Sequence, residues 1–176
     1  MRQTAMVNEL AITVIGPDRT GIVADVAEAL SGLGANLTDS TMTRLRGHFA
    51  MTLICTGPSA RAVEEALAPL SGDGGLLATV REVQPETDAS APGAPYLVSV
   101  HGADRLGIVA AVTRVVAEAG GNITDLTTRL AGSLYVLVAE VDLPSGGADG
   151  LAARLAQAGG SLGVEVTLRS AASDLL

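Results

Sequence analysis

Two short segments of the chain carry the same residues, and their polar groups could hold a small molecule. Both segments read G-x-D-R-x-G-I-V, with Asp18 and Gly21 in the first and Asp104 and Gly107 in the second. A strand-like apolar run comes before each motif and helical spacing follows it, so the motif would open a helix. Backbone amides at a helix N-terminus have no partner within the helix and attract anions. A ligand carboxylate could bind there while the aspartate binds an ammonium group.

The same residues also have a purely structural explanation. The two motif aspartates could be helix N-caps that accept hydrogen bonds from backbone amides. Gly16 and Gly102 would permit a sharp turn after the strand. Gly21 and Gly107 would lie in the first helical turn, at a cost of about 0.5–1 kcal/mol relative to alanine, which close packing of another backbone could offset. From the residues alone, both explanations stay open.

The other reactive side chains do not form a catalytic pattern. His48 and His101 are the only histidines and fall at non-equivalent places of the repeat described below, without a metal-ligand partner at recognisable spacing. Cys55 is the only cysteine, so it can form neither an internal disulfide nor a zinc cluster. Nucleophile-elbow, dinucleotide-binding and P-loop motifs are missing from the sequence. We therefore predict a protein that is not an enzyme and has no metal or cofactor.

Composition and charge narrow the classes of partner. Of the 176 residues, 48% are apolar, the net charge is −8, and the 11 basic residues are dispersed. Proteins that bind nucleic acid draw much of their affinity from clustered cations, so direct nucleic-acid binding is not expected. No apolar run reaches the roughly 18 residues needed to cross a membrane, and the N-terminus lacks a signal-peptide pattern. The sequence predicts a cytoplasmic protein without a membrane contact.

The motif belongs to a repeat that covers nearly the whole chain. Gly16 and Gly102 are 102 − 16 = 86 residues apart, and the same offset maps residues 36–39, NLTD, onto residues 122–125, NITD. The matching of Arg44-Leu45 with Arg129-Leu130 lowers the offset to 85, which predicts one inserted residue and a bulge in the first copy. The predicted organisation is a module at 8–84, a linker at 85–95 rich in proline, alanine and acidic residues, and a module at 96–170.

Each copy shows the order strand, helix, strand, strand, helix, strand. The expected strands span 9–15, 37–44, 49–56 and 76–83 in the first copy and 96–100, 123–130, 134–143 and 164–168 in the second. Two interleaved β-α-β units of this kind form an α+β, ferredoxin-like fold with both helices on one face of a four-stranded antiparallel sheet. The polar second strands could pair with another chain, so we expect a homodimer.

The motif, followed after the helix by G-[AG]-N-[LI]-T-D, resembles the signature of ACT domains. Two such modules without a catalytic domain are similar to the glycine cleavage system transcriptional repressor family. In ACT proteins, ligands lie between two modules, against the loop after the first strand of one and the start of the second strand of the other. The resemblance implies a ligand-binding set of Asp18, Gly21, Ile22, Asn36, Asp104, Gly107, Ile108 and Asn122.

The resemblance implies a non-catalytic protein that senses an amino acid, with glycine as one candidate, and that acts on transcription through a protein partner. Two alternatives stay open, namely a detached regulatory subunit of a biosynthetic enzyme and an assembly module that binds no ligand. Some ligand-binding ACT proteins carry a histidine where Gly16 and Gly102 stand. Here His101 lies one residue earlier, so we expect it inside the strand and on the other face.

Overall fold

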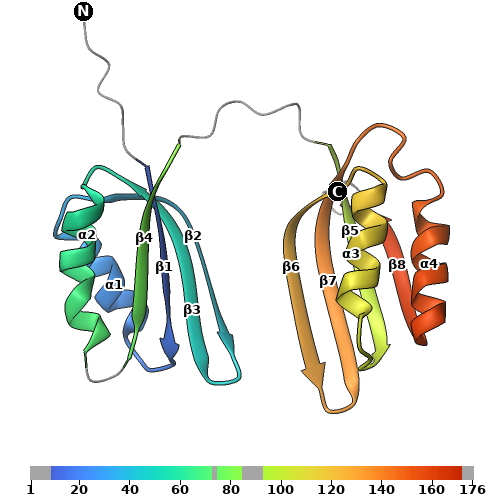
Figure 1. Ribbon diagram of the computed structural model, residues 1–176, viewed down its shortest axis with the longest axis horizontal. Coiled ribbons are helices and arrows are strands. Elements are labelled where there is room, and N and C mark those ends of the chain that lie inside the picture. The colour runs from blue at the N-terminus through green and yellow to red at the C-terminus, as the bar shows by residue number, and fades with distance from the viewer. Residues whose placement is uncertain (1–8, 73–74, 85–92, 172–176) are drawn as a thin grey trace, which may run out of the picture. The chain divides into compact units, whose positions relative to one another are not determined.

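The computed structural model describes residues 9–72, 75–84 and 93–171. The chain forms two compact units, residues 1–88 and 89–176, which we call module 1 and module 2. Each module has a hydrophobic core of its own. Each consists of a sheet with its helices packed on one face (Figure 1).

Module 1 is an antiparallel four-stranded sheet with the order β2-β3-β1-β4. Its elements are β1 (Glu9–Pro17), α1 (Ile22–Ser31), β2 (Asn36–Leu45), β3 (His48–Thr56), α2 (Ala60–Leu67), a 3₁₀ helix (Ala68–Ser71) and β4 (Leu77–Val83). The second helix begins later than Pro58, because Ser59 is its N-cap and accepts a hydrogen bond from the Ala62 amide.

Module 2 repeats this topology with the order β6-β7-β5-β8. Its elements are β5 (Ala94–Ala103), α3 (Ile108–Glu118), β6 (Asn122–Ala131), β7 (Leu134–Leu143), α4 (Leu151–Leu162) and β8 (Val164–Ser170). The predicted fold of two ferredoxin-like modules is therefore confirmed. The prediction that the linker extends to residue 95 differs from the structure, because Ala94 and Pro95 already pair with Leu143 and Asp142. Residues 85–92 lie outside the described ranges.

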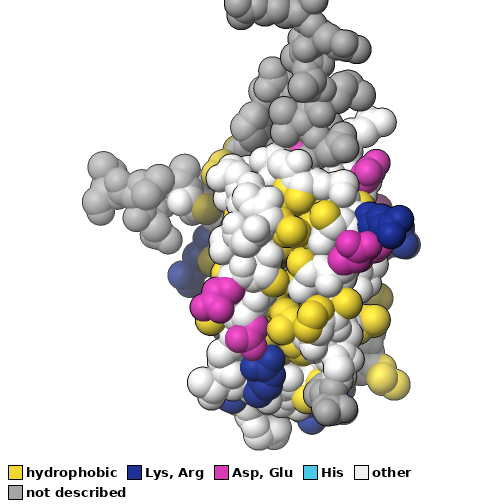
Figure 2. Space-filling view, turned by 90° about the vertical axis from the view of Figure 1, so that its left-hand side faces the viewer, with side chains coloured by type: hydrophobic (Ala, Val, Ile, Leu, Met, Phe, Trp, Pro, Cys, Tyr) yellow, Lys and Arg dark blue, Asp and Glu magenta, His cyan; other side chains and the backbone are white. Residues whose placement is uncertain are grey.

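The core of each module follows from two hydrophobic periods that meet. Alternate residues of β1, among them Ile12 and Val14, face the helices and are almost fully buried. Ile22, Val26 and Leu30 recur along one side of α1 and cover them. Val23, expected to join this stripe, is 44% exposed because it lies outside the contact with the sheet. Seen from the helical side of module 1, apolar side chains run down the middle and charged ones lie toward the flanks (Figure 2).

The opposite sheet face of each module carries no helix. In module 1 its cross-strand rows bring one threonine from every strand into line. The row consists of Thr41, Thr52, Thr13 and Thr79. The hydroxyls of Thr13 and Thr52 are 3.5 Å apart, within hydrogen-bonding distance. This helix-free face is therefore polar at its centre, although it also carries the exposed apolar pair Ile15 and Leu77 near one end.

The register shows that the repeat keeps an offset of 86 residues through the central hairpin. Leu45 pairs with His48, and Ala131 pairs with Leu134, so both turns contain two residues. The predicted inserted residue in the first copy is therefore wrong, because Arg44 is equivalent to Leu130 and not to Arg129. Both modules instead contain a register shift at the same place, at residues 37–39 and 123–125.

Within the described parts of the chain, no helix is long and apolar enough to cross a membrane.

Candidate functional site

The second glycine of each motif is required by the backbone. Gly21 and Gly107 both have a φ of 88° and are the N-cap residues of α1 and α3. A left-handed conformation of this kind costs other residues about 1–2 kcal/mol. Neither helix has a side-chain cap. The N-cap role considered for Asp18 and Asp104 is therefore wrong, and the glycines precede the first helical turn rather than lying in it.

The first glycine of each motif lies inside a strand and makes room for a neighbouring strand. Gly16 belongs to β1, and a Cβ atom there would come within 2.8 Å of the Gly75 carbonyl oxygen. Gly102 belongs to β5, and its Cβ would come within 2.7 Å of Val164 Cγ1. The predicted sharp turn at these positions is wrong. Their role is the close approach of the central strand to Gly75 and Leu76 just before β4, or to Val164 at the start of β8.

Each motif leaves unpaired amides at the start of a helix. The first helical hydrogen bonds run from the amides of Asp25 and Ala111 to the carbonyls of Gly21 and Gly107, with N–O distances of 2.9 Å. The preceding amides, beginning at Ile22 in module 1, therefore have no carbonyl within the helix to accept from them. Ile22 and its module 2 equivalent, Ile108, are each 2% exposed. Their side chains anchor the loop in the core, so only their backbone can contact a ligand.

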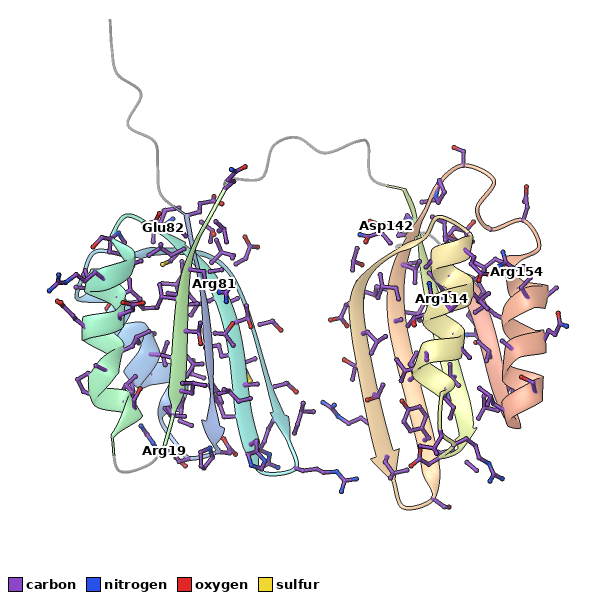
Figure 3. All side chains as sticks on the ribbon, viewed as in Figure 1. Arg19, Arg81, Glu82, Arg114, Asp142 and Arg154 are labelled. Atoms are coloured by element: carbon purple, nitrogen blue, oxygen red, sulfur yellow. The ribbon has the colours of Figure 1, made fainter. Side chains whose placement is uncertain are left out.

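Two ion pairs fix the motif loop of module 1. Asp18 lies 3.4 Å from Arg44 of β2, and Arg19 lies 2.7 Å from Asp25 of α1. The Asp18 amide also donates to the Gly47 carbonyl in the β2-β3 turn, at 2.9 Å. The charged side chains of the module 1 loop are therefore already paired with residues of the same module. Figure 3 shows Arg19 beside the end of β1.

The motif loop of module 2 lacks these partners. Leu130 and Ala111 stand at the positions of Arg44 and Asp25. Asp104 and Arg105 make no hydrogen bond or ion pair with the residues that the structure describes. Leu106, between them and Gly107, is 98% exposed. Of the two loops, this one presents an aspartate, an arginine and unpaired amides that no described residue of the chain engages.

The predicted asparagines lie at the other end of each sheet. Asn36 pairs with Thr56, which pairs with Glu9 at the start of β1, whereas the motif loop follows Pro17 at its end. Glu9–Pro17 has nine residues, so the two ends are about 25 Å apart at the usual strand rise. Asn122 has the same place in module 2, opposite Asp142. A single module therefore does not bring the two parts of the predicted site together, and a site using both must take one part from each of two modules.

Asn122 borders a groove that the sequence did not reveal. A cavity of about 530 Å³ lies between α3 and the start of β6, and it is lined by Ala110, Thr113, Arg114, Ala117, Gly121, Asn122 and Ile123. Arg114 brings a cation to the groove (Figure 3). Its counterpart at the 86-residue offset, Glu28, is an acid. No motif marks Arg114, and only this difference of charge between the repeats could have drawn attention to it.

The histidines and the cysteine do not contribute to these sites. His48 starts β3 and is exposed, and His101 lies within β5, exposed on the helix-free face as expected. Cys55 is fully buried, and burial raises the pKa of its thiol. Among the described residues, no three histidine, cysteine or acidic side chains are grouped so that they could hold a metal ion.

The fold and the two motif loops define a class of protein, in which two ferredoxin-like modules each carry a glycine-started helix after the first strand. The ACT domain family model matches residues 8–80 and 95–169. The chain therefore belongs to the ACT domain family, as the sequence resemblance indicated.

Two sequence relatives each match a segment of less than half of this chain. A UPF0237 protein of Listeria monocytogenes is 36% identical over 76 residues, which is 43% of this chain and 85% of the relative. A UPF0237 protein of Methanocaldococcus jannaschii is 37% identical over 75 residues, or 42% of this chain and 83% of the relative.

Two crystal structures match over both modules. The structure of an unknown protein from Galdieria sulphuraria is 29% identical and has a TM-score of 0.78, with 93% of this chain and 98% of that one covered. The structure of a candidate glycine cleavage system transcriptional repressor has a TM-score of 0.72 at 21% identity, with 94% and 98% covered. At that identity, the second likeness shows the fold alone.

Proposed function

We propose that this protein is a non-catalytic regulator that senses a small amino acid, with glycine as the first candidate. The observation that carries the proposal is the motif loop of module 2, where Asp104 and Arg105 lack partners among the described residues beside unpaired helix amides. Those amides and Arg105 suit a carboxylate, and Asp104 suits an ammonium group. An α-amino acid carries both groups on one carbon. Membership of the ACT family and the description of one solved relative as a candidate glycine cleavage repressor support this assignment.

The ligand set has two halves, and each module carries an equivalent copy of both. One half is the loop with Asp104, Gly107 and the Ile108 amide, or with Asp18, Gly21 and the Ile22 amide. The other half is an asparagine at the start of a second strand, Asn36 or Asn122, whose side-chain amide offers both a donor and an acceptor. Each half comes from a different module, in the same chain or in a second copy. The module 2 loop is the stronger of the two, since the Asp18 carboxylate is already paired with Arg44.

The experiment is a thermal-shift screen of the twenty amino acids, followed by calorimetry with the amino acid that stabilises the wild-type protein. Losing a hydrogen bond to a charged group costs about 1.5–3 kcal/mol, so Asp104→Asn should bind at least tenfold more weakly. Asp18→Asn is the matched control in the module 1 loop and should bind with less than a threefold change. Asn122→Ala and Asn36→Ala test the second half of the set.

One result would reject this function, and another would reject only its site. The first is that none of the twenty amino acids stabilises the protein, and the second is that Asp104→Asn and both asparagine variants bind as wild type does. The first result would favour an assembly module without a ligand. The second would leave a sensor whose site lies elsewhere.

The sensing reaches transcription through a protein partner in this proposal, because the net charge of −8 disfavours direct contact with DNA. The exposed Leu106 and the apolar side chains of the unpaired β6 edge, Leu126 and Leu130, are suited to a protein contact. We also propose a cytoplasmic location and a homodimer. A partner that is an amino-acid biosynthetic enzyme, rather than a transcription factor, would make the protein a detached regulatory subunit. Affinity capture with and without the stabilising amino acid tests which partner binds.

A further inference from the structure

Module 2 contains a second cavity, at the end of the sheet that is remote from its motif loop. The cavity has a volume of about 680 Å³ and lies where β5 begins and β7 and β8 end. Among its lining residues are Leu97, Thr124, Glu140, Asp142 and Arg169. Figure 3 shows Asp142 near this end of the sheet. Because the motif loop follows Ala103 at the opposite end of β5, the cavity is separate from that loop, whereas Asn122 of the proposed ligand set pairs with Asp142 beside the cavity.

The strand register determines how the charged side chains surround the cavity. Leu97 of β5 pairs with Glu140 on one side and with Arg169 on the other, so these three residues form one row on the helix-free face. Glu140 and Arg169 are two strands apart, a separation of about 10 Å. Asp142 lies two residues further along β7 and points to the same face. An acid pair therefore stands opposite a guanidinium across a gap that a small molecule can span.

None of the three charged groups is neutralised by the residues that the structure describes. Neither Glu140, Asp142 nor Arg169 takes part in an ion pair or a side-chain hydrogen bond there. Thr124, another lining residue, is the residue skipped by the register shift between Ile123 and Asp125. In module 1 the equivalent Thr38 hydroxyl donates to the Ile54 carbonyl at 3.4 Å, and no such bond is made by Thr124 among the described residues.

Module 1 provides an internal comparison, because it has the arginine of this site and lacks both acids. Arg81 pairs with Ala11 as Arg169 pairs with Leu97. Ile54 and Thr56 stand at the positions of Glu140 and Asp142, at the offset of 86 residues. The acid pair opposite the arginine is therefore specific to module 2 and is not a general feature of the repeat.

From this arrangement we infer that the cavity binds a basic amino acid with two ammonium groups and one carboxylate, such as lysine or ornithine. The α-carboxylate pairs with Arg169, and the two ammonium groups pair with Glu140 and Asp142. The ligand's net charge of +1 opposes the net negative charge of this row, in which Asp125 also pairs with Glu140. The Thr124 hydroxyl completes the polar lining. This inference does not depend on the function proposed for the motif loops.

Isothermal titration calorimetry of the full chain tests the charge pattern. L-Lysine and L-ornithine should bind. Norleucine lacks the side-chain ammonium and cadaverine lacks the carboxylate, so each should bind at least tenfold more weakly. Equal binding of lysine, norleucine and cadaverine, or no binding of lysine and ornithine at millimolar concentration, would overturn the inference.

Single variants locate the site. Glu140→Gln, Asp142→Asn and Arg169→Gln should each weaken lysine binding at least tenfold, whereas the control Arg81→Gln in module 1 should leave it unchanged. Should a neutral variant fail to fold, Glu140→Ile with Asp142→Thr installs the residues that module 1 already carries, and it should also lose binding. Lysine binding that is kept in the Glu140, Asp142 and Arg169 variants would overturn the inference.

Discussion

Alanine at Gly102 is expected to destabilise module 2 by crowding two strands that lie side by side. Its Cβ would lie 2.7 Å from Val164 Cγ1 and 3.0 Å from the Val164 Cα and Cβ atoms, closer than normal packing allows. Overpacking of this kind typically costs about 1–3 kcal/mol. The module must shift β5 away from β8 or expel the Val164 side chain, and either change loosens the core beneath.

The chain offers a selective probe for this measurement. Both tyrosines, Tyr96 and Tyr135, lie in module 2, and the protein has no tryptophan. Tyrosine fluorescence during urea unfolding therefore reports on module 2. With an m-value of about 1 kcal/mol/M for a small module, the midpoint should fall by about 1–3 M. Gly160→Ala is the control, because a Cβ there meets no atom within 4 Å. It should leave the midpoint unchanged or raise it, since alanine favours a helix over glycine by about 0.5–1 kcal/mol.

A double-mutant cycle identifies the cause. Val164→Ala alone removes two buried methyl groups, at about 0.8 kcal/mol each. In the Gly102→Ala background the same change also removes the 2.7 Å contact with Cγ1, so it should cost less or even restore stability. Two results would contradict this explanation of Gly102. One is a Gly102→Ala variant with the urea midpoint of the wild type, and the other is a Val164→Ala change that lowers the free energy of unfolding equally in both backgrounds.

Four further predictions concern other parts of the chain. Gly107→Ala should destabilise module 2 by about 1 kcal/mol and Gly107→Asn by less, because asparagine tolerates the left-handed conformation; equal midpoints in urea for both variants would contradict this. Burial raises the pKa of the Cys55 thiol above its ordinary 9.0. The free energy of unfolding should therefore be unaffected by this thiol below that pH and should fall as pH rises above it, because the thiol then ionises in the unfolded chain. In urea titrations over the same pH range, Cys55→Ala, which has no such group, should lose less of its free energy of unfolding. Light scattering at micromolar concentration should give about 35 kDa, twice the 17.6 kDa of one chain; a value near 17.6 kDa would exclude the dimer. Mobility shift at low salt, where screening is weakest, should show no sequence-specific DNA complex with the protein alone.

The strands and helices could be predicted because their hydrophobic periods are clean. Ile22, Val26 and Leu30 recur every four residues, and the same spacing returns at Ile108, Val112 and Val116. Element ends were less certain, since β5 begins at Ala94, where the sequence resembles a linker. Pro95 is tolerated there because it lies next to the start of the strand, where its missing amide disturbs the ladder little.

The motif residues were harder to interpret, because the backbone geometry that requires each glycine cannot be seen in the sequence. The sequence allows Asp18 to cap the helix, but the helix starts three residues later, at a left-handed Gly21. The sequence also did not reveal that Asp104 lacks an ion-pair partner among the described residues. This depends on Leu130, which occupies in module 2 the position that Arg44 has in module 1. The repeat alignment had matched Arg44 to Arg129. A sequence match one residue out of register thus concealed the main difference between the two loops.

The ion pairs of the module 1 loop make its mobility dependent on salt. Arg19 with Asp25 and Arg44 with Asp18 are partly exposed pairs, each worth at most about 1 kcal/mol, and added salt screens them. The module 2 loop has no such pairs among its described residues and so responds little. Raising the ionic strength should therefore speed amide hydrogen exchange at residues 18–22 and leave residues 104–108 nearly unchanged. The two loops with the same motif would then differ in their rates of amide hydrogen exchange at low salt, and the two rates would become similar at high salt.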